Sequence, residues 1–385
     1  MRKKIFLMLV LLAAVVSGAW AQDPATYKIT LAEGTEDAEN WNVPAEAEAG
    51  SPVNVTYSGE KRVKSVKAVK EGGAPAPVDP LAVPLTIEAI TPGNISVSSP
   101  KEGMQYSKNG GAKTAVTTSI DVAAGDKVQF YGNGTSINCY NGTIITGSGD
   151  GFTCKVYGNI MSLVDEENFA TATTLSANNT FNSLFSGFTT LTDASGLLLP
   201  ATQLALATSC YYSMFQGCSA LTAAPALPAT QLVASCYYWM FKDCASLTTA
   251  PELPATTLAN SCYYGMFRGC TALTAAPALP ATQLENWCYR EMFYNCTALT
   301  ASPVLPATQL VNYCYYLMFY NCEKLATVTC LATSGINQKN STTDWLKNAG
   351  RDAEDTKTVY TVSTADWPSG DNGIPNGWER VNVDN

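Results

Sequence analysis

Hydrophobic positions recur at a fixed spacing of 26 residues through the second half of the chain. Each copy has the frame C-Y-x-x-M-F-x-x-C-x-x-L, whose methionine falls at Met214, Met240, Met266, Met292 and Met318. The segment Leu-Pro-Ala-Thr occurs five times with the same phase. Upstream, residues 184–191 are a degenerate copy in which Phe188 replaces the second cysteine. Such a period predicts an array of stacked units, because one unit cannot bury its apolar face alone.

Within one copy, the apolar spacing predicts a short helix. Cys236, Met240 and Cys244 lie four residues apart, which places them on one face of a helix. The residue before the second cysteine is Gly, Asp or Asn in each copy, and Gly and Asn accept the left-handed conformation that ends helices. Residues 247–251, which end in proline, are predicted to be extended. Each unit is therefore expected to contain a short strand, an extended return and a short helix.

Alternation of apolar and polar residues predicts strands before the repeats. The pattern is clearest at Tyr27–Leu31, Val53–Tyr57 and Lys127–Tyr131, and Asn-Gly steps between later segments favour tight hairpins. The five cations of Lys61–Lys70 fit an edge strand protected from pairing, or alternatively a patch for an anionic surface. We expect a small β domain at 22–70, a Gly/Pro/Ala linker at 71–84, a β domain with an N-terminal cap at 85–170, the repeats at 171–335, and a C-terminal cap and tail at 336–385.

Residues 1–21 have the features of a cleaved signal peptide. Arg2, Lys3 and Lys4 precede twelve apolar residues, and Ala19-Trp20-Ala21 fits a cleavage site that would leave Gln22 first. The apolar run is shorter than the roughly 20 residues that a membrane span needs, and no later segment is long and apolar enough. We expect an exported protein without a transmembrane segment in its mature chain, located outside the cell, in a periplasm or at the cell surface.

At the other end of the repeats, residues 341–350 predict a capped helix. Ser and Thr stand at its start, where their side chains can cap the first turn, and Gly350 stands just after its end. The helix is expected to close the open end of the array.

The amino-acid composition excludes several kinds of catalytic and metal site. The 385 residues include no histidine, which excludes a Ser-His-Asp triad, a Cys-His dyad and imidazole metal ligands. A net charge of −9 with 23 Lys and Arg disfavours nucleic acid as a partner. Carboxylate pairs are scarce in the repeats, so we expect a protein that is not an enzyme and holds no cofactor or metal.

Ten of the thirteen cysteines fill two columns of the repeat. A thiolate metal site is disfavoured by their wide spacing, and a disulfide within one predicted helix would have to span too great a distance. Disulfides between neighbouring units, or between Cys139 and Cys154, are alternative interpretations. The preferred interpretation is that the repeat cysteines are small buried hydrophobic residues.

The frame C-Y-x-x-M-F-x-x-C-x-x-L-T-x-x-P-x-L-P-A-T resembles the 26-residue repeats of bacterial surface proteins of the BspA-like leucine-rich-repeat family. The resemblance covers residues 180–335, and the ending 367–378 is similar to the tail of such proteins. It implies a mixed α/β repeat solenoid that is leucine-rich-repeat-like, on an exported protein that binds other molecules. Some members are adhesins, a role that is not attached to particular residues.

Columns that vary between copies should face solvent. Their large members are candidate ligand contacts, because exposed Trp and Tyr anchor protein partners and stack on sugars: Trp239, Trp287, Tyr294, Tyr313 and Tyr320. The surrounding surface is poor in charge and rich in hydroxyl groups, which favours an extracellular protein or glycan as ligand. The alternatives are a structural spacer or a surface-assembly subunit without a specific ligand.

Overall fold

The computed structural model describes residues 5–10, 26–28, 41–42, 46–48, 52–57, 79–132, 142–175, 177–199 and 207–383. The chain divides into two compact units, residues 1–79 and 80–385. In the first unit, β1 (Ile5–Val10) and β3 (Trp41–Asn42) pair with β5 (Pro52–Tyr57), and β2 (Thr26–Lys28) pairs with β4 (Glu46–Glu48), all antiparallel. β1 lies inside the expected signal peptide, whose cleavage stays a prediction. The basic segment 61–70 and the linker up to residue 78 lie outside the described residues.

The second unit begins with two β-sheets that share one apolar core. The larger sheet has the order β14-β13-β6-β11-β8-β9, and the smaller has the order β10-β7-β12. Their bounds are β6 Thr86–Ala89, β7 Gly93–Ser98, β8 Gln105–Lys108, β9 Thr114–Ala115, β10 Ser119–Val122, β11 Lys127–Tyr131, β12 Ile144–Ser148, β13 Cys154–Asn159 and β14 Leu191–Leu198. The 3-10 helices η2 (Pro80–Ala82) and η4 (Ile160–Leu163) flank this core. The strand expected at Lys127–Tyr131 is confirmed, and alternate residues such as Val128 and Phe130 are fully buried.

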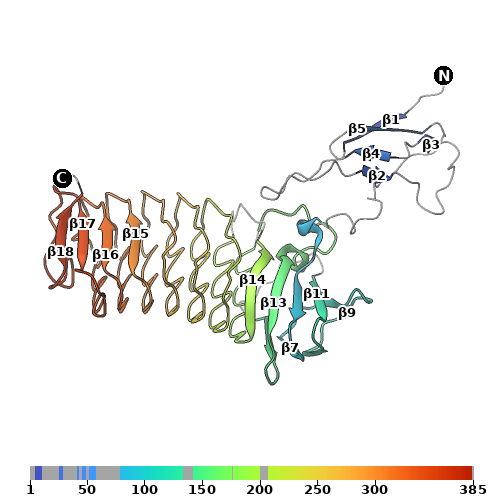
Figure 1. Cartoon of the computed structure of the whole chain (residues 1–385), viewed down its shortest axis with the longest axis horizontal. Coiled ribbons are helices and arrows are strands. Elements are labelled where there is room, and N and C mark those ends of the chain that lie inside the picture. The colour runs from blue at the N-terminus through green and yellow to red at the C-terminus, as the bar shows by residue number, and fades with distance from the viewer. Residues whose placement is uncertain are drawn as a thin grey trace. The chain divides into compact units, whose positions relative to one another are not determined.

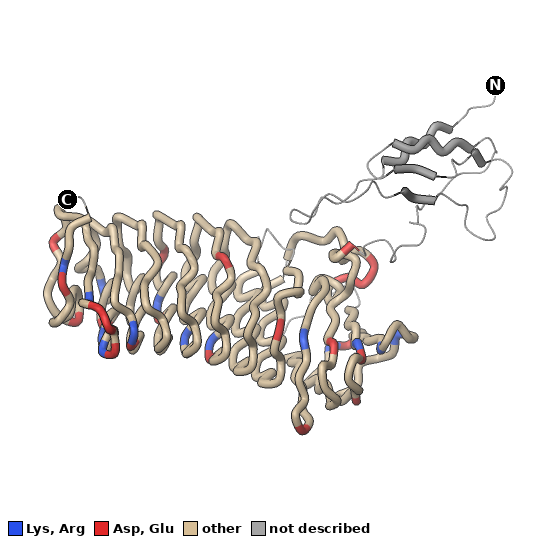
Figure 2. Tube along the Cα trace, viewed as in Figure 1, with Lys and Arg blue, Asp and Glu red and all other residues tan. Residues whose placement is uncertain are grey.

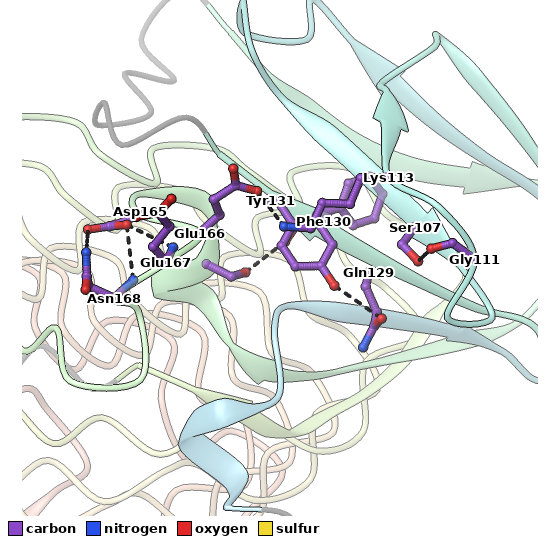
Figure 3. Close-up of polar contacts among 11 residues, drawn as sticks. Ser107, Gly111, Lys113, Gln129, Phe130, Tyr131, Asp165, Glu166, Glu167 and Asn168 are labelled. Carbon is purple, nitrogen blue, oxygen red and sulfur yellow. Dashed lines mark hydrogen bonds and ion pairs between the residues drawn. The ribbon is translucent and has the colours of Figure 1, made fainter. Parts of the chain in front are cut away.

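Polar contacts tie the β8–β9 hairpin to the segment that follows η4 (Figure 3). Lys113 Nζ lies 2.6 Å from a Glu166 carboxylate oxygen and 4.1 Å from the centre of the Tyr131 ring. One oxygen of the preceding Asp165 side chain accepts hydrogen bonds from the backbone N–H groups of Glu167 and Asn168. This turn directs the chain from the sheets into the first coil of the repeats.

From β14 onward the chain forms a series of coils that stack side by side (Figure 1). β13 and β14 pair in parallel, and single parallel bridges such as Gln231–Thr257 and Thr249–Ala275 connect later coils. At the C-terminal end, a parallel sheet has the order β15 (Ala301–Leu305), β16 (Thr327–Cys330), β17 (Thr358–Thr361) and β18 (Glu379–Asn382). No helix among the described residues is long and apolar enough to cross a membrane.

The mixed α/β, leucine-rich-repeat-like solenoid with one helix per unit is wrong. The described residues form no α-helix, and the segment around Cys236, Met240 and Cys244 is a run of turns. Within this run, every fourth residue has a positive φ: Ser235 (56°), Trp239 (54°) and Asp243 (60°). A left-handed residue in each turn interrupts the repeated dihedral angles that an α-helix requires.

Hydrogen bonds of the turn segment alternate between two partners. The N–H groups of Tyr238 and Met240 bond to carbonyls three residues earlier, on Ser235 and Tyr237. Those of Tyr237 and Trp239 bond instead to Cys262 and Tyr264 in the next coil. Every second backbone N–H of the turn segment therefore bonds to a carbonyl of the next coil. Since turns of four residues also return side chains to one face, the expected buried face is correct although the element is not.

The helix expected at residues 341–350 is wrong for the same reason. This segment is a further turn run, with positive φ at Asn340, Asp344 and Asn348. Its carbonyls accept hydrogen bonds from the preceding coil, as in Phe319 N–H to Trp345 O at 2.8 Å. Residues 341–350 are thus a diverged coil in which Trp345 takes the place of the repeat methionine.

Like residues stack in columns through the core of the coils. Phenylalanine rings follow one another at centroid distances of 5.4 to 5.8 Å, in the column Phe185, Phe215, Phe241, Phe267, Phe293 and Phe319. An inner tyrosine column, Tyr211, Tyr237, Tyr263, Tyr289 and Tyr315, stacks at 5.6 to 6.2 Å. Each of these rings is at most 1% exposed.

The repeat cysteines are buried beside these rings, as expected. All cysteines from Cys154 to Cys330 are buried free thiols, whereas Cys139 lies outside the described residues. Each second-column thiol is placed to donate to the carbonyl of a phenylalanine in the preceding coil, as in Cys270 Sγ to Phe241 O at 3.1 Å. Burial raises the pKa of the first-column thiols Cys210, Cys262 and Cys314 to about 12. The thiols therefore stay protonated and pack as small apolar groups.

Candidate functional site

A second aromatic column lies outside the inner tyrosines and is interrupted once by an arginine. We call it the outer ladder; its members are Tyr212, Tyr238, Tyr264, Arg290 and Tyr316. Tyr212, Tyr238 and Tyr264 stack at 4.6 and 4.4 Å between ring centres. The Arg290 guanidinium fills the next position, 5.0 Å from the Tyr264 ring and 4.6 Å from the Tyr316 ring. A planar cation thus replaces one ring without breaking the stack.

A buried carboxylate accompanies this arginine. Glu291 is 4% exposed, and one of its oxygens accepts hydrogen bonds from Tyr264 Oη at 3.0 Å and Arg290 Nε at 3.1 Å. Its other oxygen pairs with Arg268. Burial, followed by the Glu291 charge, raises the pKa of Tyr264, so its hydroxyl remains a donor. A buried carboxylate is tolerated because these donors compensate for its lost hydration.

The five predicted contact residues converge on this charged centre from several coils. Trp287 is 38% exposed, and its ring lies 5.1 Å from that of Tyr313. Tyr294 and Tyr320 stack on each other at 4.7 Å, and the Arg268 guanidinium lies 4.3 Å from the Tyr294 ring. Trp239 is half-buried; its ring lies 6.3 Å from that of Tyr264. Contacts between rings and cations therefore connect the predicted set to Arg268 and Arg290, above the buried Glu291.

Several of these aromatic residues have unfavourable backbone conformations. Trp287, Tyr313 and Trp239 have φ angles of 65°, 58° and 54°, in the left-handed region. Bulky side chains are uncommon there, and the conformation costs an L-residue on the order of 1–2 kcal/mol. Other copies place Ser209, Ser235 and Ser261 in the column of Trp287 and Tyr313. The left-handed φ is therefore common to this column in every copy, and only the side chain changes from serine to an aromatic residue.

Charge also gathers on the coils unevenly. Figure 2 shows the Lys and Arg of the coil array in its lower half, with an upper edge free of charge. Lys242 Nζ lies 4.3 Å from the Trp239 ring and Lys339 Nζ lies 5.8 Å from the Tyr313 ring, so both cations adjoin predicted contact residues. Arg268, Arg290 and Glu291 were not among the residues predicted for the site. The available signal was that one copy alone replaces the second tyrosine and follows it with a glutamate.

Cavities are present on the coils that the structure describes. One of about 210 Å³ is lined largely by amide and hydroxyl groups, among them Asn337, Gln338, Asn340 and Thr343, and also by Lys339. Another, of about 520 Å³, is lined by Pro225, Pro228, Pro251 and Pro254 with alanines between them. The polar cavity shares Lys339 with the aromatic surface, so it extends the candidate site.

Comparisons with family models, curated proteins and solved structures find no match. Membership of the BspA-like family therefore stays a prediction from the repeat frame. Within the described part of the chain, no three Cys, Asp or Glu side chains are grouped so that they could hold a metal ion. The site is defined by its own geometry: aromatic rings and four cations of the stacked coils, with one buried carboxylate beneath them.

Proposed function

We propose that this is an exported bacterial cell-surface protein that binds an extracellular protein or glycan, in the manner of an adhesin, and that it does so without catalysis. The observation that carries the proposal is Trp287, which is 38% exposed beside Tyr313 and the Arg290 guanidinium. Three other copies place serine at this position, so the fold does not require the exposed aromatic residue. Trp, Tyr and Arg are also the residue types that dominate binding energy at interfaces.

The exposed face of the outer ladder suits a ligand that covers several coils. Tyr212, Tyr238 and Tyr316 are partly exposed, whereas Tyr264 between them is buried and bonds to Glu291. Trp287 differs, since it is 38% exposed. A ligand can therefore use Trp287 as an anchor and the ladder as a polar surface beside it.

Binding can be tested with the purified protein on immobilised glycans and extracellular matrix proteins. The Trp287→Ser variant introduces the residue that Ser235 and Ser261 supply in the same column, so it removes the anchor and keeps a residue that folds with this positive φ in other copies. We expect it to lose about tenfold or more in affinity while its stability changes little. A matched control is Thr282→Ala, an exposed position of the same copy. Absence of any specific capture, or capture unaffected by Trp287→Ser, would favour a structural spacer instead.

Export is tested separately by sequencing the N-terminus of the secreted protein. The small-x-small pattern before Gln22 predicts that this residue is the first of the mature chain. Retention of residues 1–21 in the secreted protein would contradict the expected signal peptide.

A further inference from the structure

Aromatic rings surround the guanidinium of Arg290, and only its Nε group donates a hydrogen bond among the described residues. Four rings surround it, with centres at 4.6 Å (Tyr316), 5.0 Å (Tyr264), 5.2 Å (Trp287) and 5.8 Å (Tyr313). Its Nε group donates to Glu291. Among the residues that the structure describes, neither Nη group has a hydrogen-bond acceptor. The terminal fork of this arginine is therefore available to a ligand.

The charge of the surrounding cluster favours an anion. Arg268 and Arg290 share a single carboxylate, Glu291. Lys339 adds a third cation beside Tyr313, and within the described part of the chain it forms no ion pair. This local excess of positive charge stands on a chain whose net charge is −9. A guanidinium fork matches the two oxygens of a carboxylate or of a sulfate group.

The neighbouring surface provides contacts of the kind that sugars use. Trp287 is exposed beside Tyr313 and offers a flat apolar surface next to the cation. Lys339 also lines the 210 Å³ cavity, together with Asn337, Gln338, Asn340 and Thr343, whose side chains can bond to hydroxyl groups.

The main chain of this region disfavours an extended peptide as ligand. The N–H groups of Trp287, Tyr289 and Glu291 bond to carbonyls of the next coil, and those of Arg290 and Met292 bond within their own turns. No strand edge is thus left here to which a peptide backbone could add. Recognition depends on side chains alone, which suits a carbohydrate better than a strand-forming peptide.

We propose that Arg290 and Lys339 form a subsite for an acidic sugar. The oxyanion of the sugar, a carboxylate or a sulfate ester, pairs with the Nη groups of Arg290 and with Lys339. The pyranose ring lies on Trp287, and its hydroxyl groups reach the amide-lined cavity. This inference rests on the proposed binding function and specifies the ligand class of the same surface.

The repeat itself supplies a variant that should fold. Arg290→Tyr restores the residue that Tyr212, Tyr238, Tyr264 and Tyr316 provide in the other four copies. The double variant Arg290→Tyr, Glu291→Ser reproduces the first copy, where Ser213 follows Tyr212, and leaves no buried carboxylate. Thermal unfolding of both variants verifies that the coils remain intact.

The test measures binding of the purified protein to four probes by calorimetry. They are trigalacturonic acid, its neutral methyl ester, a sulfated galactan tetrasaccharide whose only acidic groups are sulfate esters, and a hexaglutamate peptide. We expect one or both acidic sugars to bind at least about tenfold more tightly than the ester, since charge-assisted bonds to Arg are lost in the ester. We expect Arg290→Tyr to remove that preference and added salt to weaken it. The response of the two acidic sugars identifies the oxyanion.

Three results would overturn the subsite. They are equal binding of acid and ester, acidic-sugar binding that is unchanged in Arg290→Tyr, and tighter binding of hexaglutamate than of either sugar. If a neutral glycan or a protein is captured through Trp287 while no acidic sugar binds, the subsite fails and the proposed binding function stands. If nothing is captured in either set of experiments, the binding function itself fails.

Discussion

Alkaline pH should unfold the coil array, because its buried thiols resist ionisation only in the folded state. Burial raises the pKa of five thiols from 9.0 to about 12: Cys154, Cys210, Cys262, Cys314 and Cys330. Above pH 9 these thiols ionise in the unfolded chain but stay protonated in the folded one. The folded state then binds more protons, so the stability that is fully present below pH 9 is lost as pH rises towards 12.

The magnitude is large because the effect is repeated. At pH 10, one such thiol lowers the free energy of unfolding by about 1.4 kcal/mol, and five lower it by about 7 kcal/mol. Burial also raises the pKa of each remaining repeat thiol. Since typical folding stabilities are about 5–15 kcal/mol, we expect unfolding near pH 10.

The assay is urea unfolding followed by far-ultraviolet circular dichroism at pH 7 to 10.5, with reductant present. The slope of stability against pH gives the number of protons released on unfolding, at about 1.4 kcal/mol per proton and pH unit. The Cys262→Ala, Cys314→Ala double variant should lower this number by nearly two at pH 10, which separates the thiols from general charge repulsion. Release of fewer than about two protons by the unmodified protein, or an unchanged slope in the variant, would refute the reasoning.

Three other substitutions test the coil geometry by chemical denaturation. Phe267→Ala removes a ring stacked at 5.8 Å on both neighbouring phenylalanines, and should cost about 3–5 kcal/mol; a loss below about 1 kcal/mol would contradict close stacking. Gly335→Ala should prevent the native coil, because its Cβ would lie 2.2 Å from Leu310 O at a φ of 73°; near-normal stability would show that this turn is misplaced. Gly217→Asn should be nearly neutral, since other copies use Asn in this column and the nearest atom is 3.7 Å from the added Cβ; marked destabilisation would mean that the copies are not equivalent.

The repeat period was sufficient to predict which residues are buried. Cys236, Met240 and Cys244 are each fully buried, as their spacing of four residues requires. The same spacing led to the wrong element, because a helix and a run of four-residue turns both return every fourth side chain to one face. Local propensity could not separate them, since Trp239 in the left-handed region contradicts ordinary preferences.

The candidate site was predictable in part. Variation between copies predicted that the columns of Trp239, Trp287 and Tyr313 face solvent. Trp287 is exposed, but the prediction is wrong for the column of Trp239, in which Ser213 and Glu291 are buried. The charged centre could not be predicted from the sequence, because Arg290 and Glu291 contact Tyr264 and Arg268 of the preceding copy. Those partners lie 22 to 27 positions away in sequence.

The sequence by itself determined the 26-residue period, the buried columns and the aromatic identity of the exposed surface. These features depend on side-chain type and spacing, which are properties of each copy alone. Only the tertiary structure decided that the turns replace helices and that the outer ladder encloses Arg290. The physical reason is that every second N–H in the turn segments bonds to a neighbouring coil about 26 residues away, as Tyr237 bonds to Cys262. Stacking therefore selects a backbone that no single copy would adopt by itself.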